Sequence, residues 1–228
     1  MGPQAGGYLY NTLMNMAVRE YGAKSNDSFP EVILHSIPVP DFISSDKHKG
    51  RALTMLKIRV KEMGNLNISC LSIACNTAHI LMNELKKESA VPLVSMIEAV
   101  VEQVKEDGLN KVGLLATPST VKYGLYQSAL RKYGITTLVP ARAQLRMIEN
   151  IVRNILKGKV SLVDGKKLMV IVNFLRQKGV QGIILGCTEL PLVFPSKYDL
   201  PVYNCVEILA RALLHKYYRQ NTIKKTYE

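Results

Sequence analysis

The sequence predicts an α/β protein made of two similar lobes, each a parallel sheet layered with helices. Two short apolar runs carry most of this prediction: Leu71-Ser72-Ile73-Ala74 and Gly182-Ile183-Ile184-Leu185. Such runs are typical of strands that are buried on both faces, as they are in parallel sheets. Stretches with apolar residues at helical spacing lie between the predicted strands, so strands and helices alternate along the chain.

The first half of the chain begins with a predicted helix over 5–21, which Gly22 is expected to end. A β-rich run over 32–37 is expected to form a strand that stops at the prolines that follow it. The other elements expected in this half are a helix over 49–63, a strand leading to Cys75, a helix over 80–87 and a strand over 91–94.

The same alternation then restarts, and no low-complexity linker separates the halves, so we expect two closely packed lobes. The predicted helices cover 97–106, 117–131 (with Thr117-Pro118-Ser119 as its cap), 144–157, 162–178 and 206–218. The predicted strands cover 111–116, 135–139, 181–186 and 202–204.

Composition places the chain among ordinary globular proteins, with 228 residues, 47% hydrophobic and 21% charged. No segment approaches the roughly 18 uninterrupted apolar residues of a membrane span. The first residues show no basic region followed by an apolar run, so we expect a cytoplasmic protein. Four cysteines in a chain of this length do not suggest a disulfide framework, and we expect reduced thiols.

The formal charge of +12 raises the question of nucleic-acid binding. The basic residues are spread over many predicted helices, and there is no zinc-finger spacing, RNA-recognition signature or aromatic–basic interleaving. We therefore interpret the charge as a solvated surface and expect no nucleic-acid or membrane partner. A basic environment would also attract an acidic amino acid.

Two of the predicted strands end at a cysteine that is followed at once by hydroxyl or amide side chains: Cys75-Asn76-Thr77 and Cys187-Thr188-Glu189. A thiol at that position lies where open α/β sheets bind ligands, and near a helix start, which favours the thiolate. Either cysteine alone is more simply explained as an inert buried side chain. The recurrence of the arrangement favours two chemical groups that face one substrate.

Cys75-Asn76-Thr77-Ala78-His79 and Gly186-Cys187-Thr188-Glu189-Leu190-Pro191 together resemble the aspartate/glutamate racemase family. The segments 112–120, 124–127 and 1–5 resemble it too, so the resemblance covers essentially the whole chain. It implies a cofactor-independent racemase that acts on an amino acid, aspartate or glutamate, in the cleft between two lobes. It also implies a homodimer and a reaction that needs no pyridoxal phosphate, metal or nucleotide.

The resemblance further implies that the C-terminal helix returns to the first lobe. We therefore expect an N-terminal lobe of residues 1–96 plus 206–228, which carries Cys75, and a C-terminal lobe of residues 97–205, which carries Cys187. The family normally begins with an apolar strand that ends in a Gly-Gly-Met-Gly-Pro loop. Met1-Gly2-Pro3 matches the tail of that loop, and the strand is not in the sequence. Either the given start lies too far downstream, or the protein lacks this strand. A missing inner strand would expose two sheet edges.

Racemisation requires removal of a Cα proton and its return on the opposite face, which two acid–base groups achieve without turning the substrate over. We expect Cys75 and Cys187 to be these groups and to exchange roles with the direction of reaction. Backbone N–H groups at the helix starts and nearby hydroxyls would hold the substrate. The expected substrate-binding residues are Met1, Asn76, Thr77, Thr117, Thr120, Lys157 and Thr188.

Several of these residues have a simpler explanation. Thr117 and Thr120 could be helix caps, and Lys157 could be a cation at a helix C-terminus. His79, four residues after Cys75, has the spacing of a metal pair, but two ligands make a poor zinc site, so we expect a packing histidine and no metal. Glu189 could orient the chemistry at Cys187 or stabilise a helix start by its charge.

The motif that concerns the substrate side chain differs from the family pattern. Many aspartate-type members carry Pro-Asp-Arg in the loop after the second strand, whereas this chain has Pro40-Asp41-Phe42. The cation could instead be Lys157, Lys47, Lys49 or Arg51. The alternatives are a hydantoin racemase or maleate isomerase type of enzyme, and a non-catalytic metabolite-binding protein on the same fold.

Overall fold

The computed structural model describes residues 2–225, with side chains as far as residue 219. It contains two parallel sheets. The smaller sheet pairs β1 (Leu71–Ser72) with β2 (Leu93–Val94). The larger sheet has the order β4-β3-β5-β6, and these strands are β3 (Lys111–Ala116), β4 (Thr136–Leu138), β5 (Gly182–Gly186) and β6 (Val202–Asn204).

Helices alternate with these strands, which confirms the predicted α/β class. Around the smaller sheet the chain forms α1 (Pro3–Tyr21), α2 (Lys49–Gly64), the 3₁₀ turn η2 (Thr77–Leu81) and α3 (Met82–Lys86). Around the larger sheet it forms α4 (Met96–Glu106), α5 (Pro118–Lys122), α6 (Leu125–Arg131), α7 (Arg142–Leu156), α8 (Leu162–Gln177) and α9 (Cys205–Lys225).

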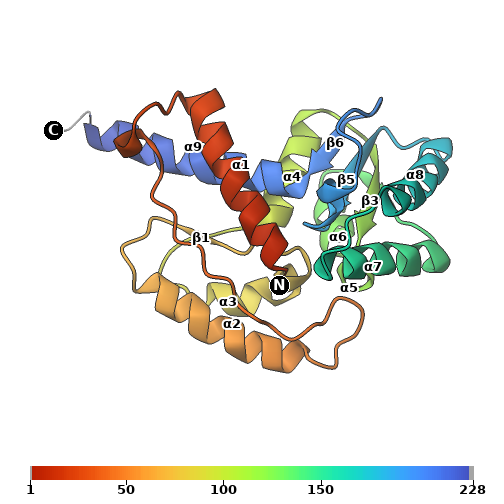
Figure 1. Cartoon of the computed structure of the whole chain (residues 1–228), viewed down its shortest axis with the longest axis horizontal. Helices are drawn as coiled ribbons and strands as arrows, with labels where there is room; N and C mark the ends of the chain where they lie inside the picture. Colours follow the sequence, from red (N-terminus) through yellow and green to blue (C-terminus); the bar gives the residue numbers. More distant parts are fainter. Residues whose placement is uncertain (1, 226–228) are drawn as a thin grey trace.

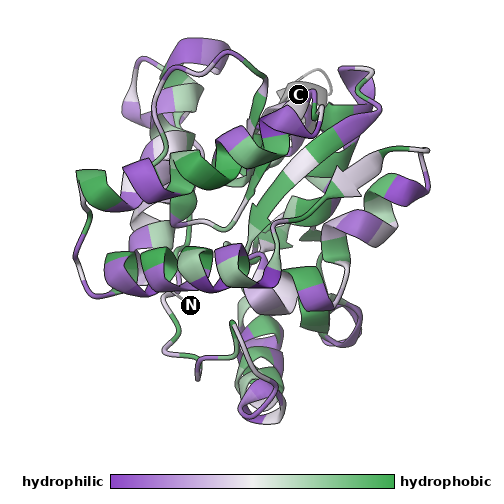
Figure 2. Ribbon diagram, turned by 90° about the vertical axis from the view of Figure 1, so that its right-hand side faces the viewer, coloured by the Kyte–Doolittle hydropathy of each residue, from purple (hydrophilic) through white to green (hydrophobic). Residues whose placement is uncertain are grey.

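Both faces of the larger sheet are covered by helices (Figure 1). Val112 and Leu114 of β3 point into a core shared with α1, α4 and α9, whereas the neighbouring Leu115 points into a core shared with α7 and α8. Figure 2 shows that the strands of this sheet are apolar over most of their length. Burial on both faces explains why these strands are continuous apolar runs in the sequence.

One helix expected from the sequence is divided in two. The stretch 117–131 forms α5 and α6, because Gly124 between them adopts the left-handed conformation, with φ of 63°. Glycine takes this conformation without the steric cost that other residues meet. The break redirects the chain, so that α6 carries Tyr126 into the centre of the molecule, where its side chain is fully buried.

The strand expected over 32–37 is not formed, and that prediction is wrong. This segment is extended but makes no backbone ladder with any described strand. A strand requires a neighbour to accept and donate its backbone hydrogen bonds, and here the segment borders a cavity instead. A β-rich composition predicts extended backbone, but it does not supply a partner.

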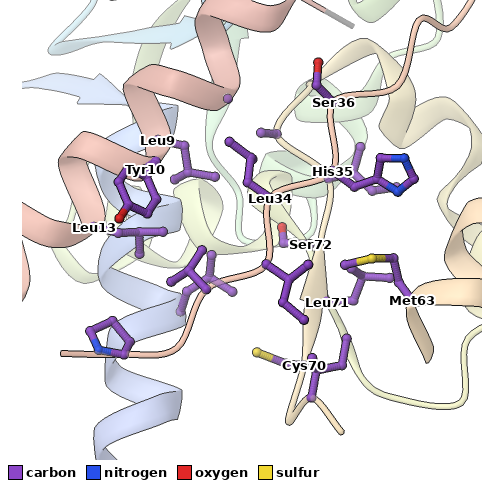
Figure 3. A pocket seen from close by; sticks show the side chains of 18 of the residues that line it. Leu9, Tyr10, Leu13, Leu34, His35, Ser36, Met63, Cys70, Leu71 and Ser72 are labelled. Carbon is purple, nitrogen blue, oxygen red and sulfur yellow. The ribbon is translucent and has the colours of Figure 1, made fainter. Parts of the chain in front are cut away.

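This first cavity has a volume of about 800 Å³ and lies along the edge of β1 that does not face β2. In Figure 3, Leu9 and Leu13 of α1 lie on one side of it and Leu71 and Met63 on the other. Leu34, on the extended segment, reaches between them. Among the described strands, β1 pairs only with β2. Among residues 2–225, no helix is both long enough and apolar enough to cross a bilayer.

Candidate active site

A second cavity, of about 210 Å³, brings the two predicted cysteines together. Cys75 follows β1 of the smaller sheet, and Cys187 follows β5 of the larger one. The carboxyl ends of parallel strands are the usual ligand-binding edge of such sheets. The described residues that line the cavity are Gly2, Pro3, Val39, Pro40, Asp41, Phe42, Ile43, Cys75, Asn76, Thr77, Thr117, Val152, Leu156, Cys187, Thr188 and Glu189.

Cys75 is half-buried in the tight turn between β1 and η2, where its N–H donates to Ile73 over 2.7 Å. Burial raises the pKa of its thiol, and the negative charge of Glu189 adds to that effect. The backbone N–H groups of Ala78 and Thr77 lower the pKa, because they stabilise the thiolate. The net direction is upward from the ordinary cysteine value.

Cys187 is almost completely buried, and its Sγ donates a hydrogen bond to Oε2 of Glu189 over 3.0 Å. Burial, followed by the charge of Glu189, raises the pKa of this thiol well above its ordinary value. A thiol that donates to a carboxylate is stabilised in its protonated form. Cys187 is therefore held as a thiol more firmly than Cys75.

Glu189 is buried and accepts two hydrogen bonds on one oxygen, from Cys187 and, over 2.9 Å, from the hydroxyl of Thr188. The amino-terminal turn packs directly against its other oxygen. A Cβ atom on Gly2 would lie only 2.5 Å from Oε1 of Glu189 and 2.7 Å from Cδ2 of Leu156, so a larger residue at this position would require these side chains or the turn to shift.

His79 fixes the turn that carries Cys75. Its Nε2 accepts the backbone N–H of Met96 over 3.0 Å, so Nδ1 carries the proton and donates to the carbonyl of Cys75 over 2.8 Å. Burial lowers the pKa of His79 to about 4, which keeps the ring neutral. Because both ring nitrogens bond to backbone, His79 is a structural residue. The described residues hold no group of three or more His, Cys, Asp or Glu side chains placed to bind a metal ion.

Three threonine hydroxyls join the two halves of the chain behind the cavity. Thr77 bonds Thr117 over 2.9 Å and Thr120 over 3.3 Å, and Thr117 donates to Thr120 over 2.9 Å. Thr117 also caps α5, because its side chain accepts the backbone N–H of Thr120. Thr117 therefore is a helix cap that also lines the cavity, whereas Thr120 is fully buried behind it.

The loop over residues 39–44 contributes Phe42 and Ile43 to the wall of the cavity. The hydroxyl of Ser119 donates to the carbonyl of Phe42 over 2.8 Å, and the N–H of Ser119 donates to the carbonyl of Ile43 over 2.9 Å. Arg153 of α7 bonds Asp41 over 2.8 Å and Ser44 over 3.1 Å. These contacts hold the 39–44 loop to both α5 and α7.

The family model described as Asp/Glu/Hydantoin racemase matches residues 1–213 of the chain. The chain belongs to this family. The two cysteine turns therefore lie within a racemase-type domain, and the resemblance of the sequence motifs to the aspartate/glutamate racemases is confirmed.

Individual relatives support the same assignment. An aspartate racemase from Picrophilus torridus has a TM-score of 0.80 and 26% identity, covering 94% of this chain and 90% of that one. An aspartate racemase homologue from Pyrococcus horikoshii OT3 has a TM-score of 0.76 and 27% identity, covering 93% of each chain. A glutamate racemase from Aquifex pyrophilus is 30% identical over 76% of this chain and 58% of its own length, so this chain spans less than two thirds of it.

The structure brings most of the predicted site residues of this racemase-family chain to one cavity. Six of them line it: Cys75, Asn76, Thr77, Thr117, Cys187 and Thr188. Thr120 lies behind the wall. Lys157 is exposed at the C-terminal cap of α7 and does not line the cavity, and Met1 lies outside the described residues.

The cations considered for the substrate side chain are not in the cavity wall. Lys49 donates to the hydroxyl of Tyr123 over 2.7 Å, and Lys47 and Arg51 are exposed. Among the described lining residues there is no lysine or arginine, and the charged ones are Asp41 and Glu189.

From the sequence, Ser119 was expected only as part of a helix cap, and Arg153 and Tyr126 were given no role in the site. Ser119 and Arg153 hold the 39–44 loop, and Tyr126 contacts Asn76 beside Cys75. Tyr126 lies in a segment that resembles the family, but nothing in its sequence surroundings shows which residue it meets. Arg153 lies one helical turn before Lys157, so the predicted basic residue was one turn away from the one that reaches the loop.

Proposed function

We propose that this protein racemises an amino acid without a cofactor, by proton transfer at Cα between Cys75 and Cys187. The observation that carries the proposal is the meeting of two thiols, from two different sheets, in one small cavity. The match to a family of racemases over residues 1–213 supports the same reaction, which is an isomerisation.

The reaction balances without any further reagent. One cysteine, as the thiolate, takes the proton from Cα, and the electron pair left on Cα is delocalised into the substrate carboxylate. The other cysteine, as the thiol, gives its proton to the opposite face of Cα. The first cysteine ends as a thiol and the second as a thiolate, so the reverse reaction can start at once.

The hydrogen bonds of the two thiols favour one starting state. Cys187 donates to Glu189, which favours the thiol, whereas the sulfur of Cys75 receives the N–H groups of Thr77 and Ala78, which favours the thiolate. We propose that Cys75 is the base and Cys187 the acid for one enantiomer, and that their roles reverse for the other.

The hydroxyls of Thr117 and Thr188 and the polar turn at Asn76-Thr77 surround the thiols and would hold the substrate carboxylate and ammonium groups. Aspartate and glutamate are the first substrates to test, because the names of the relatives include aspartate racemase and glutamate racemase. A neutral amino acid is the second candidate. It is favoured by a wall that contains Val39, Phe42, Ile43, Val152 and Leu156 and, among its described residues, no lysine or arginine.

The remaining parts of the proposal concern the whole protein. We propose a cytoplasmic homodimer whose ligand is the amino acid, with no nucleic-acid or membrane partner. We propose lobe boundaries of 1–96 plus 206–228 and 97–205, and the packing of α9 against α1 supports the return of the C-terminal helix (Figure 1). Light scattering on the purified protein measures the oligomeric state, and a monomer would contradict the dimer.

The test of the activity is chiral chromatography of L- and D-aspartate, glutamate, alanine and serine after incubation with protein dialysed against a chelator. Wild type is expected to convert at least one of them, and Cys75→Ala and Cys187→Ala are each expected to abolish the conversion. Cys70→Ala is the matched control, since Cys70 lies at the first cavity and should leave conversion unchanged. If no amino acid is converted, or if either cysteine variant keeps wild-type activity, the proposal is wrong.

A further inference from the structure

Tyr126 is a buried tyrosine that contacts both of the turns that carry the reacting thiols. It lies on α6, and its side chain is fully buried. Its hydroxyl donates to Oδ1 of Asn76, the residue after Cys75, over 2.6 Å. Its ring lies against Gly186, the residue before Cys187, because a Cβ atom on Gly186 would be 3.1 Å from Cε2 of Tyr126.

Asn76 has both ends of its amide group fixed. Oδ1 accepts from Tyr126, and Nδ2 donates to Sγ of Cys205, at the start of α9, over 3.2 Å. Asn76 is itself almost completely buried. The amide group of Asn76, the residue that follows Cys75, is therefore held at both ends. Its two partners lie 50 and 129 positions away in the sequence.

Both hydrogen-bond partners of Asn76, Tyr126 and Cys205, keep one protonation state over the pH range of the assay. Burial raises the pKa of Tyr126 well above its ordinary value, so its hydroxyl remains a donor. Burial also raises the pKa of Cys205 to about 12, so its thiol stays neutral beside the amide. Neither group is free to exchange protons with the substrate, and their contribution is positional.

From these contacts we infer that Tyr126 is a positioning residue for Cys75: it fixes Asn76 and thereby aligns the thiol of Cys75 with the substrate Cα. The inference rests on the proposed racemase function and goes further, because it assigns a role to a residue that does not line the cavity. Proton transfer is sensitive to alignment, and a shift of a fraction of an ångström at the sulfur is enough to slow it.

The Tyr126→Phe variant distinguishes the contact of Tyr126 with the Cys75 turn from its contact with the Cys187 turn. It removes the hydroxyl that holds Asn76 but keeps the ring against Gly186, so only the Cys75 step should slow. We expect kcat/KM to fall roughly tenfold. The fall must be equal in both directions, because two enantiomers have the same free energy in water.

The isotope effect of α-deuterated substrate distinguishes positioning from general damage. With the Cys75 step slowed, the isotope effect on kcat/KM rises for the enantiomer that Cys75 deprotonates. It falls for the other enantiomer, for which Cys75 only returns a solvent-derived proton. Cys205→Ala, which removes the second partner of Asn76, should give the same split. Tyr203→Phe is the matched control, because Tyr203 is also buried and bonds Asp107 over 2.7 Å. It should leave both isotope effects unchanged.

An unchanged pair of isotope effects in Tyr126→Phe would overturn the inference while leaving the racemase function standing. If wild type converts no amino acid, hydrogen–deuterium exchange of the peptides covering 75–81 and 182–186 still tests the contact. Faster exchange in 75–81 alone supports fixation of the Cys75 turn by Tyr126, and equal exchange in wild type and variant contradicts it.

Discussion

The Sγ atom of Cys187 donates a hydrogen bond to Oε2 of Glu189, two residues further along the chain, over 3.0 Å. Of the two roles considered for Glu189, this contact supports orientation of the chemistry at Cys187. The carboxylate has no arginine or lysine among the described residues that share the cavity wall with it. Its negative charge therefore acts on the thiols, and it raises the pKa of both.

In Glu189→Gln, the increase of kcat/KM with rising pH should occur at lower pH than in wild type. Glutamine keeps an oxygen that can accept from Cys187 but removes the charge, so the pKa of each thiol falls. Because the reaction requires one thiolate, kcat/KM should reach its half-maximal value at lower pH than in wild type. A pH profile of racemisation measures the shift. Glu102→Gln, which changes an exposed ion pair with Lys105, is the control and should leave the profile in place. A shift to higher pH would contradict the assignment.

The ion pair of Arg153 with Asp41 should affect substrate binding through the 39–44 loop, which lines the cavity. Arg153→Met removes the contacts to Asp41 and Ser44, so the wall formed by Phe42 and Ile43 becomes less ordered. We expect KM to rise about two- to fivefold, the size of a partly exposed ion pair, with a smaller change in kcat. Steady-state kinetics measures both values. Arg176→Met removes the exposed pair with Asp199 and should leave KM unchanged.

Phe42→Arg should change which side chain the site prefers. Phe42 lines the cavity and is almost fully buried, and a cation there would face the substrate side chain. We expect the ratio of kcat/KM for aspartate to that for alanine to rise about tenfold, which corresponds to about 1.4 kcal/mol. Phe42→Met is the control for loss of the ring. An unchanged ratio in Phe42→Arg would show that this loop does not contact the substrate side chain.

His79 should make the folded state sensitive to acid. Its pKa is about 4 in the folded protein, below the ordinary 6.5, so the unfolded chain binds the proton more tightly. The stability that neutral His79 contributes is complete above pH 6.5 and is lost as the pH falls from 6.5 toward 4. Between pH 7 and pH 5 the loss should be about 2 kcal/mol.

Chemical denaturation at the two pH values measures this loss. His79→Gln should be less stable than wild type at pH 7, because it loses the bonds to Met96 and Cys75. The difference between the two proteins should narrow by about 2 kcal/mol at pH 5. If the two proteins differ in unfolding free energy by the same amount at pH 7 and pH 5, His79 does not titrate below its ordinary range.

The meeting of the two thiols could be predicted from the sequence because it depends on local pattern and sheet geometry. Each cysteine follows a short apolar strand, and the carboxyl ends of parallel strands lie at the binding edge. Helix boundaries were also predicted closely where apolar spacing and capping residues agree. The helix ending at Gly22, which has φ of 69°, is one example.

The parts that were not predicted depend on contacts between distant segments. The bond from Ser119 to Phe42 joins residues 77 positions apart, and no local pattern indicates it. The strand expected over 32–37 is not formed, because a strand needs a neighbouring strand to pair with. Whether such a neighbour is present depends on the rest of the sheet. Thr117 was expected to be a helix cap, a substrate-binding residue or both, and the structure shows that its hydroxyl caps α5 and that the residue lines the cavity.

The central claim is that two thiols act on opposite faces of Cα, and deuterium placement during racemisation in D₂O tests it most directly. With two thiols, every molecule of the newly formed enantiomer should carry deuterium at Cα at early times, while the remaining substrate keeps protium. The product must receive its proton from the second thiol, which has equilibrated with solvent. Protium carried from substrate into product, or deuterium in recovered substrate at the rate of racemisation, would indicate a single base and contradict the account.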